Sequence, residues 1–156
     1  MPLTVEIVAA ERSILEGMAD EVLADTVTGQ IGVLPRHAPL LTLLAPGVVR
    51  LRSGQEETVL SVGGGFLEVS DDRVVILADS AERAEEIDIA RAEEARRRAA
   101  ERLRARTPDV DATRAQAALL RAISRMRAVE QVRRRGGRAR DGRGSADEAG
   151  VATGQL

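Results

Sequence analysis

The chain has 156 residues, enough for one domain or two small ones, and its 25 acidic and 23 basic residues give a formal net charge of −2. Every basic residue is arginine and no cysteine is present, which excludes lysine phosphate loops, Schiff-base chemistry, disulfides and thiolate metal sites. With one histidine and one aromatic residue, the sequence also excludes a histidine metal cluster and argues against aromatic platforms for nucleic acid.

The first half of the chain predicts β-strands. Leu3, Val5 and Ile7 alternate with polar residues, which is typical of a half-buried strand. Closely spaced β-rich runs follow, and the glycines at 63–65 are expected to form a turn. This pattern favours a small antiparallel β-sandwich over residues 1–80. The further strands are expected at 21–27, 31–34, 48–51, 58–62, 66–69 and 73–77, with turns at Gly17, 28–29, Pro35, 45–47, 53–54 and 70–72.

Two helices are predicted in the second half, which holds 18 of the 23 arginines. After a linker at 81–87, Asp88 is the expected N-cap of a first helix rich in Ala, Glu and Arg, and 107–109 is expected to end it. A second helix is expected to begin near Asp111, so that 88–134 forms an antiparallel α-helical hairpin.

Alanine dominates the two stripes through which these helices would pack. A buried alanine methyl group contributes on the order of 0.8 kcal/mol or less, so the hairpin is expected to need the β domain or a partner. A hairpin held this weakly can stay docked or switch between two arrangements, and the residues leave both possibilities open. The stripe residues are Ile89, Ala92, Ala95, Ala99 and Leu103, then Ala112, Ala115, Leu119, Ala122, Met126 and Val129.

The last segment, 135–156, is rich in glycine and arginine and has few large apolar residues, which predicts a disordered tail. Its basic start can contact an acidic partner, although a solvated tail without a defined role explains the same composition. The longest apolar stretch, 39–49, is much shorter than the ~20 residues of a membrane span. We therefore expect a soluble chain that meets the membrane only through a partner.

Four stretches agree, in order and spacing, with one known family. The run 28–42 (TGQIGVLPRHAPLLT) is the longest, and 46–50, 64–69 and 77–88 follow it. Together they resemble the epsilon subunit of bacterial F-type ATP synthase over residues 3–134. The resemblance implies a β-sandwich followed by a helical hairpin, as the elements above also predict. It further implies a non-catalytic rotor subunit of the central stalk, in a membrane complex that couples hydrogen ion transport to ATP synthesis.

The same resemblance implies the partners and the location. The β domain of such subunits binds the gamma subunit and the ring of c subunits, at the cytoplasmic face of the cell membrane. The hairpin can extend into the alpha/beta catalytic headpiece and inhibit ATP hydrolysis. A plain turn also explains the glycines of the interface loop, and a lone histidine is usually a hydrogen-bonded structural residue. The loop residues assigned to the c-ring and gamma interface are Gly29, Gln30, Gly32, Arg36 and His37, with glutamine where many relatives carry glutamate.

The segment 87–92 (IDIARA) matches the family's nucleotide-binding motif, which implies ATP as a regulatory ligand and no required cofactor. Arg91 is expected in the first turn of its helix, where free N–H groups favour anions, and Arg121 and Arg125 share a helix face. Several guanidinium groups can clamp a triphosphate, although solvated ion pairs explain the same arginines. The residues that the resemblance assigns to the ATP site are Glu82, Ile87, Asp88, Arg91, Ala92, Arg98, Arg121 and Arg125.

Three functions are distinguished by what they predict. A rotor subunit that regulates ATP synthase predicts co-purification with the gamma subunit, and the resemblance favours it. A free-standing ATP-sensing module predicts tight ATP binding without gamma. An arginine-rich nucleic-acid-binding protein predicts salt-sensitive binding that deletion of 136–156 removes. An independent enzyme is not expected, because no carboxylate pair stands at a motif-defined site.

Overall fold

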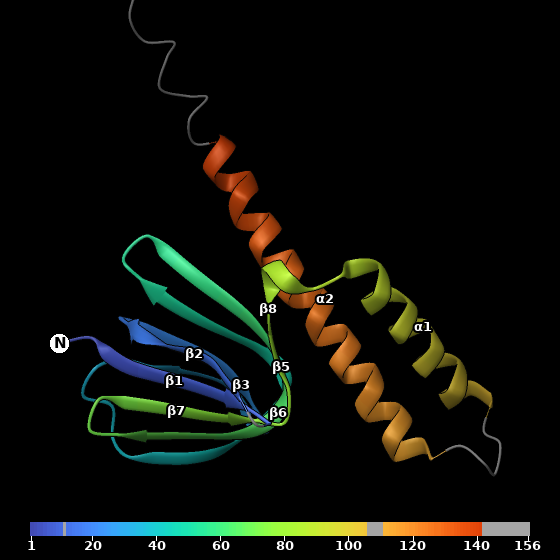
Figure 1. Ribbon diagram of the computed structural model, residues 1–156, viewed down its shortest axis with the longest axis horizontal. Helices are drawn as coiled ribbons and strands as arrows, with labels where there is room; N and C mark the ends of the chain where they lie inside the picture. Colours follow the sequence, from blue (N-terminus) through green and yellow to red (C-terminus); the bar gives the residue numbers. More distant parts are fainter. Residues whose placement is uncertain (11, 106–110, 142–156) are drawn as a thin grey trace, which may run out of the picture.

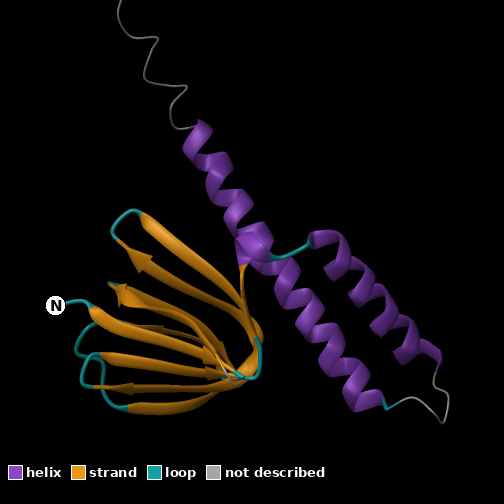
Figure 2. Ribbon diagram, in the orientation of Figure 1, coloured by secondary structure: helices purple, strands orange, loops and turns teal. Residues whose placement is uncertain are grey.

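The computed structural model describes residues 1–10, 12–105 and 111–141, in which an N-terminal β domain precedes two long helices (Figure 1 and Figure 2). No helix in these ranges is long and apolar enough to cross a lipid bilayer. The strands are β1 (Leu3–Ala9), β2 (Arg12–Ala19), β3 (Glu21–Thr26), β4 (Gly29–Val33), β5 (Leu40–Ser53), β6 (Glu56–Ser70), β7 (Arg73–Ala78) and β8 (Ala81–Arg83), and the helices are η1 (Ala84–Glu86), α1 (Ile89–Ala105) and α2 (Ala112–Asp141).

The strands described here form one sheet that folds over into the expected β-sandwich (Figure 1). Their order is β2-β1-β7-β6-β5-β3-β4, with β8 paired to β6, and every pairing is antiparallel except that of β1 with β7. Leu3, Val5 and Ile7 are fully buried, which confirms the alternation predicted for the first strand. The core is aliphatic, because Phe66 lies half exposed on the surface.

Two long strands replace several of the short strands and turns that we expected. β5 and β6 pair continuously from Leu40 opposite Val69 to Ser53 opposite Glu56. The predicted turns at 45–47 and 63–65 therefore lie inside strands, and these predictions are wrong. Gly65 serves a close approach of β6 to β7, since it has a φ of +127° and a Cβ there would collide with the carbonyl oxygen of Leu77.

β2 was not predicted at all. Gly17, expected in a turn, lies within it and pairs with Val5 on β1. The strand has a weak sequence pattern because it is an edge strand with mostly exposed side chains, so little apolar alternation is needed.

The helical hairpin, its N-cap at Asp88 and the start of the second helix near Asp111 are confirmed, and Asp111 is also an N-cap. The backbone N–H of Arg91 donates to Oδ1 of Asp88 (3.2 Å), and that of Arg114 donates to Oδ1 of Asp111 (3.1 Å). The expected linker at 81–87 contains two short elements, β8 and η1, which cover 81–86. The predicted stop at 107–109 lies outside the described residues.

The predicted end of the second helix at residue 134 is wrong. α2 continues to Asp141, so residues 135–141 are helical where a disordered tail was expected, and 142–156 lie outside the described residues. Two glycines inside this helix cost about 1 kcal/mol each relative to alanine. The guanidinium of Arg135 offsets this cost by donating to the carbonyl oxygen of Gln55 (2.8 Å) and pairing with Glu57 (2.8 Å).

The hairpin is docked on the β domain through α2, which lies between α1 and the sandwich (Figure 1). Ala128 of α2 is fully buried in a small apolar cluster, where Ile87 also packs. Beside it, the buried hydroxyl groups of Ser61 and Ser124 lie 3.0 Å apart. The apolar docking cluster consists of Val48, Val59, Ala84 and Ala128.

Candidate functional site

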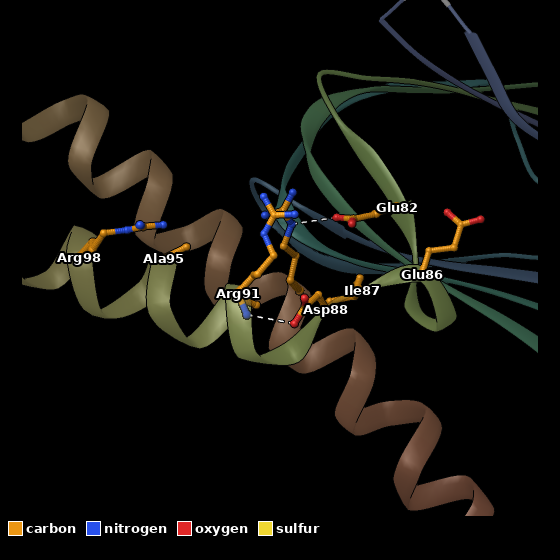
Figure 3. Close-up of a pocket in the computed structure, with 9 residues that line it drawn as sticks. Glu82, Glu86, Ile87, Asp88, Arg91, Ala95 and Arg98 are labelled. Atoms are coloured by element: carbon orange, nitrogen blue, oxygen red, sulfur yellow. Dashed lines mark hydrogen bonds and ion pairs between the residues drawn. The ribbon is translucent and has the colours of Figure 1, made fainter.

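A cavity of about 240 Å³ lies where β8, η1, α1 and α2 meet. Figure 3 shows its side chains, with Asp88 and Arg91 at the start of α1 and Glu82 on the facing strand. Seven of the eight residues predicted to bind ATP line this cavity, and two further ones, Glu86 and Ala95, were missed. The lining residues are Glu82, Glu86, Ile87, Asp88, Arg91, Ala92, Ala95, Arg98 and Arg125.

The nucleotide motif builds one wall of the cavity because it forms the first turn of α1. Asp88 caps the helix and accepts the N–H of Arg91, which fixes the backbone next to the cavity. Figure 3 shows the Arg91 side chain leaving the first turn of α1 on the side of Glu82. The free N–H groups of a helix start also favour anions. Ala95 lies one turn further on and belongs to the predicted alanine stripe, the signal that could have found it.

An ion pair crosses the cavity from α2 to the β domain. Nε of Arg125 lies 2.8 Å from Oε2 of Glu82, with the two side chains 44% and 32% exposed. Arg98 forms a pair within α1, 3.3 Å from Glu94. Because pairs this exposed contribute about 0–1 kcal/mol, these arginines can exchange a carboxylate for a phosphate at low cost.

Arg121 does not line this cavity. It lines an adjoining cavity of about 260 Å³, together with Arg12, Ser80 and the buried Ser61 and Ser124. Both cavities share Glu82 and Arg125. The predicted helix face of Arg121 and Arg125 therefore lies along the two cavities, one of which holds most of the motif.

The predicted interface residues form two groups, one at the start of β4 and one after its end. Gly29, with a φ of +125°, and Gln30, which donates to Oδ1 of Asp25 (3.2 Å), lie at its start. Arg36 and His37 follow its end, where the N–H of Arg36 donates to Oδ1 of Asp72 (2.5 Å). Nδ1 of His37 lies 2.7 Å from the carbonyl oxygen of residue 38, as a hydrogen-bonded structural histidine requires. Gly32 lies between the groups, against the side chain of Leu23.

An exposed apolar row crosses the sheet and was not predicted. Leu43 pairs with Phe66, which pairs with Leu77, so three apolar side chains stand side by side on β5, β6 and β7. Val27 extends the row, because its N–H donates to the carbonyl oxygen of Leu43 (3.1 Å). Between 47% and 60% of each of these four residues is exposed, and a contiguous apolar patch of this kind marks an interaction surface.

Metal chemistry has no visible site in the part of the chain that the structure describes. No group of three or more His, Asp or Glu side chains is placed there to hold an ion. Among the carboxyl groups of the described residues, only that of Glu57 has a clearly shifted pKa, and Glu57 lies beside the last turns of α2, away from the cavity that Arg91 lines.

Two family models, one directly after the other, match residues 2–130 of the chain. The β-sandwich domain model of the ATP synthase delta/epsilon chain matches residues 2–84, and the long α-helix domain model of the same chain matches 85–130. The boundary between the models falls at the start of η1, where the β domain ends.

Similar proteins carry the name ATP synthase epsilon chain. The one from Dehalococcoides mccartyi is 57% identical over 97 residues, which cover 62% of this chain and 69% of that relative. The one from Chloroflexus aurantiacus is 54% identical over 96 residues (62% and 69%), and the one from Moorella thermoacetica is 53% identical over 108 residues (68% and 80%).

Solved structures agree with this result. A chain of the Euglena gracilis mitochondrial ATP synthase (OSCP/F1/c-ring, rotational state 1) matches with a TM-score of 0.71 and 25% identity, covering 82% of this chain and 81% of that one. A chain of the Tetrahymena thermophila mitochondrial ATP synthase central stalk and c-ring shares the fold, with a TM-score of 0.55 and 15% identity over 81% and 96%. The chain therefore belongs to the ATP synthase delta/epsilon chain family, and within it to the epsilon chains.

Proposed function

We propose that this chain is a non-catalytic rotor subunit that couples proton flow to ATP synthesis and regulates ATP hydrolysis. Its membership of the epsilon chains supports this role, as does its 25% identity to a chain in an assembly described as F1/c-ring. In this proposal the subunit sits at the cytoplasmic face of the cell membrane, held there by the complex. The family match favours this role over a free-standing sensor or a nucleic-acid-binding protein.

The β domain supplies the partner surface of the rotor. The apolar row of Val27, Leu43, Phe66 and Leu77 is too exposed to serve the core, and it fits an apolar face of the gamma subunit. Gln30 at the start of β4 and Arg36 after its end carry hydrogen-bonding groups instead, which suits contact with the polar loops of a c-ring. The two surfaces give the β domain one contact with each partner.

The hairpin supplies the regulatory part, with ATP as its ligand. The observation that carries this proposal is the convergence of seven predicted residues from β8, the linker and both helices on one cavity. Arg91, Arg98 and Arg125 would hold the triphosphate by forked hydrogen bonds, and Asp88 would accept from the adenine amino group. At about 240 Å³ the cavity is small for a nucleotide, so ATP would extend past Arg125 into the adjoining cavity that Arg121 lines.

Binding at this junction would stabilise the docked hairpin. The ligand would touch α1, α2 and β8 together, and an extended hairpin cannot keep those groups in one place. A ligand that binds one state only shifts the population toward that state. ATP would thus favour the docked, non-inhibitory arrangement over the extended one.

A calorimetric titration of the full chain with ATP, and then with ADP, tests the ligand. We expect Arg91→Ala to abolish ATP binding, because it removes a guanidinium at the helix start. Arg97→Ala, on the exposed side of α1, is the matched control and is expected to bind as the unchanged chain does. Absence of binding at millimolar ATP would refute the ligand and leave the rotor role, which co-purification with the gamma subunit tests separately.

A further inference from the structure

A second basic region lies at the far end of the docked helix, between the ends of β5 and β6 and the last turns of α2. This arginine cleft has a volume of about 860 Å³. It shares no residue with the nucleotide cavity, our name for the 240 Å³ cavity in which ATP binding is proposed. Its charged lining residues are Arg50, Arg52, Arg134, Arg135, Arg138 and Glu57.

The charge of the arginine cleft is unbalanced, and composition does not explain it. Five guanidinium groups line the cleft beside the carboxylate of Glu57. Glu21 and Glu130, outside the lining, pair with Arg52 and Arg134, and the arginines still outnumber these carboxylates. A groove of similar size on the outer side of α1, about 820 Å³, is lined by Arg96, Arg97 and Arg104 but also by three glutamates. On α1, glutamates therefore balance the charge of the arginines. In the cleft, β5 and α2 together bring an excess of positive charge. Such an excess attracts anions.

Two guanidinium groups of the cleft, those of Arg52 and Arg135, are held in place before any ligand arrives. Glu57, whose side chain is only 8% exposed, lies 2.8 Å from Arg135 and 3.3 Å from Arg52. Arg52 also pairs with Glu21 (2.8 Å), and Arg135 donates to the carbonyl oxygen of Gln55 (2.8 Å). Because each guanidinium has five N–H donors, these contacts orient the groups and still leave donors for a ligand.

We propose that the arginine cleft binds an anion with two or more linked phosphates, at a site distinct from the nucleotide cavity. Planar guanidinium groups bind phosphate oxygens in pairs, and linked phosphates carry enough charge to balance an excess that one carboxylate or one phosphate leaves unmatched. The ligand would join arginines of β5 to Arg134 and Arg138 of α2. It would therefore stabilise the docked end of the helix by a route independent of ATP in the nucleotide cavity.

Titration of the full chain with inorganic tripolyphosphate at low ionic strength tests this site. The informative variant is R134A/R138A, because neither arginine contacts Glu57 and the network that orients the others stays intact. The matched control is R97A/R104A, which removes the same charge from the balanced groove on α1. We expect R134A/R138A to weaken binding at least tenfold and the control to stay within twofold.

A third variant separates the two sites. Arg91→Ala changes only the nucleotide cavity, so tripolyphosphate affinity is expected to remain within twofold of the unchanged chain. The proposal is overturned if the unchanged chain binds no tripolyphosphate, if the two double variants weaken binding equally, or if Arg91→Ala abolishes it. The last result would place the phosphates in the nucleotide cavity, and it would leave the ATP proposal standing.

Discussion

Arg125 on α2 and Glu82 on β8 are paired with each other, 2.8 Å apart, at the point where the nucleotide cavity meets the adjoining one. Both residues line both cavities, so a triphosphate that spans them has to pass this pair. The incoming phosphate meets an arginine that is already oriented and a carboxylate that repels it. Rearrangement of the pair is therefore expected to set the affinity for ATP.

Arg125→Gln tests the role of this arginine in binding. A hydrogen bond to a charged group contributes about 1.5–3 kcal/mol, so we expect ATP affinity to fall about tenfold or more in a calorimetric titration. Arg127→Gln is the matched control, since Arg127 also joins α2 to the β domain, through Asp25 at 3.3 Å, but lines neither cavity. An equal loss of ATP affinity in both variants would mean that docking, and not a phosphate contact, decides binding.

Ala128→Leu tests the docking cluster. Ala128 has no exposed surface and packs in the cluster of Val48, Val59 and Ala84, so the larger side chain should cost about 1–3 kcal/mol. We expect hydrogen exchange to speed up in α2 while β1, β6 and β7 stay protected. Ala90→Leu, at an exposed position of α1, should change neither the stability nor the exchange of α2. Faster exchange throughout the β domain would show that the two parts unfold as one unit.

Glu57 makes docking of the helix end depend on pH. Burial, the largest single effect, raises the pKa of Glu57, but hydrogen bonds from Arg135 and Arg52 and the charges of Arg135 and Arg50 together lower that pKa below its ordinary value of 4.5. A lowered pKa in the folded state means that the stabilisation is complete above pH 4.5 and is lost as the pH falls through the lower value.

Exchange of the last turns of α2, measured from pH 6 down to pH 3, tests this linkage after correction for the intrinsic pH dependence. We expect protection to fall on acidification in the unchanged chain, whereas Glu57→Gln should lack protection already at pH 6. The neighbouring exposed Glu56→Gln should behave as the unchanged chain does. A Glu57→Gln chain with the full acid response would remove Glu57 as its cause.

Phe66→Asp tests the apolar row as the gamma-binding surface. Phe66 is 50% exposed, so the substitution should cost little stability while placing a charge in the centre of the row. We expect co-purification with the gamma subunit to be lost and the thermal unfolding midpoint to shift by only a few degrees. Met18→Asp, equally exposed on β2 but outside the row, should leave the complex intact. If both variants still bind gamma, the gamma-binding surface lies elsewhere on the chain.

Local signals predicted the elements that local interactions build. Asp88 and Asp111 cap their helices through hydrogen bonds to residues three positions ahead, and this geometry is readable from neighbouring letters. The strand pairing of β5 with β6 is not local, and both strands continue through residues that are typical of turns, which are Pro46 and Gly47 in β5 and the glycines at 63–65 in β6. Similarly, α2 passes Gly136 because a tertiary contact of Arg135 holds the helix.

The functional surfaces also differ in whether local sequence could predict them. Seven of the nine residues that line the nucleotide cavity were predicted, because the motif of 87–92 is contiguous and Glu82, Arg98 and Arg125 follow from the family resemblance. The apolar row depends on which residues of three strands stand opposite one another, and the arginine cleft on where α2 crosses the sheet. No short segment of the chain predicts the strand register or the place where α2 crosses the sheet.

Hydrogen exchange of α2 around Ala128, with and without millimolar ATP, tests most directly the claim that ATP holds the hairpin on the β domain. The account predicts slower exchange with ATP in the unchanged chain and no effect of ATP in Arg91→Ala. Exchange that ATP leaves unchanged at concentrations where calorimetry shows binding would contradict the claim, since the ligand would then bind docked and released hairpins equally.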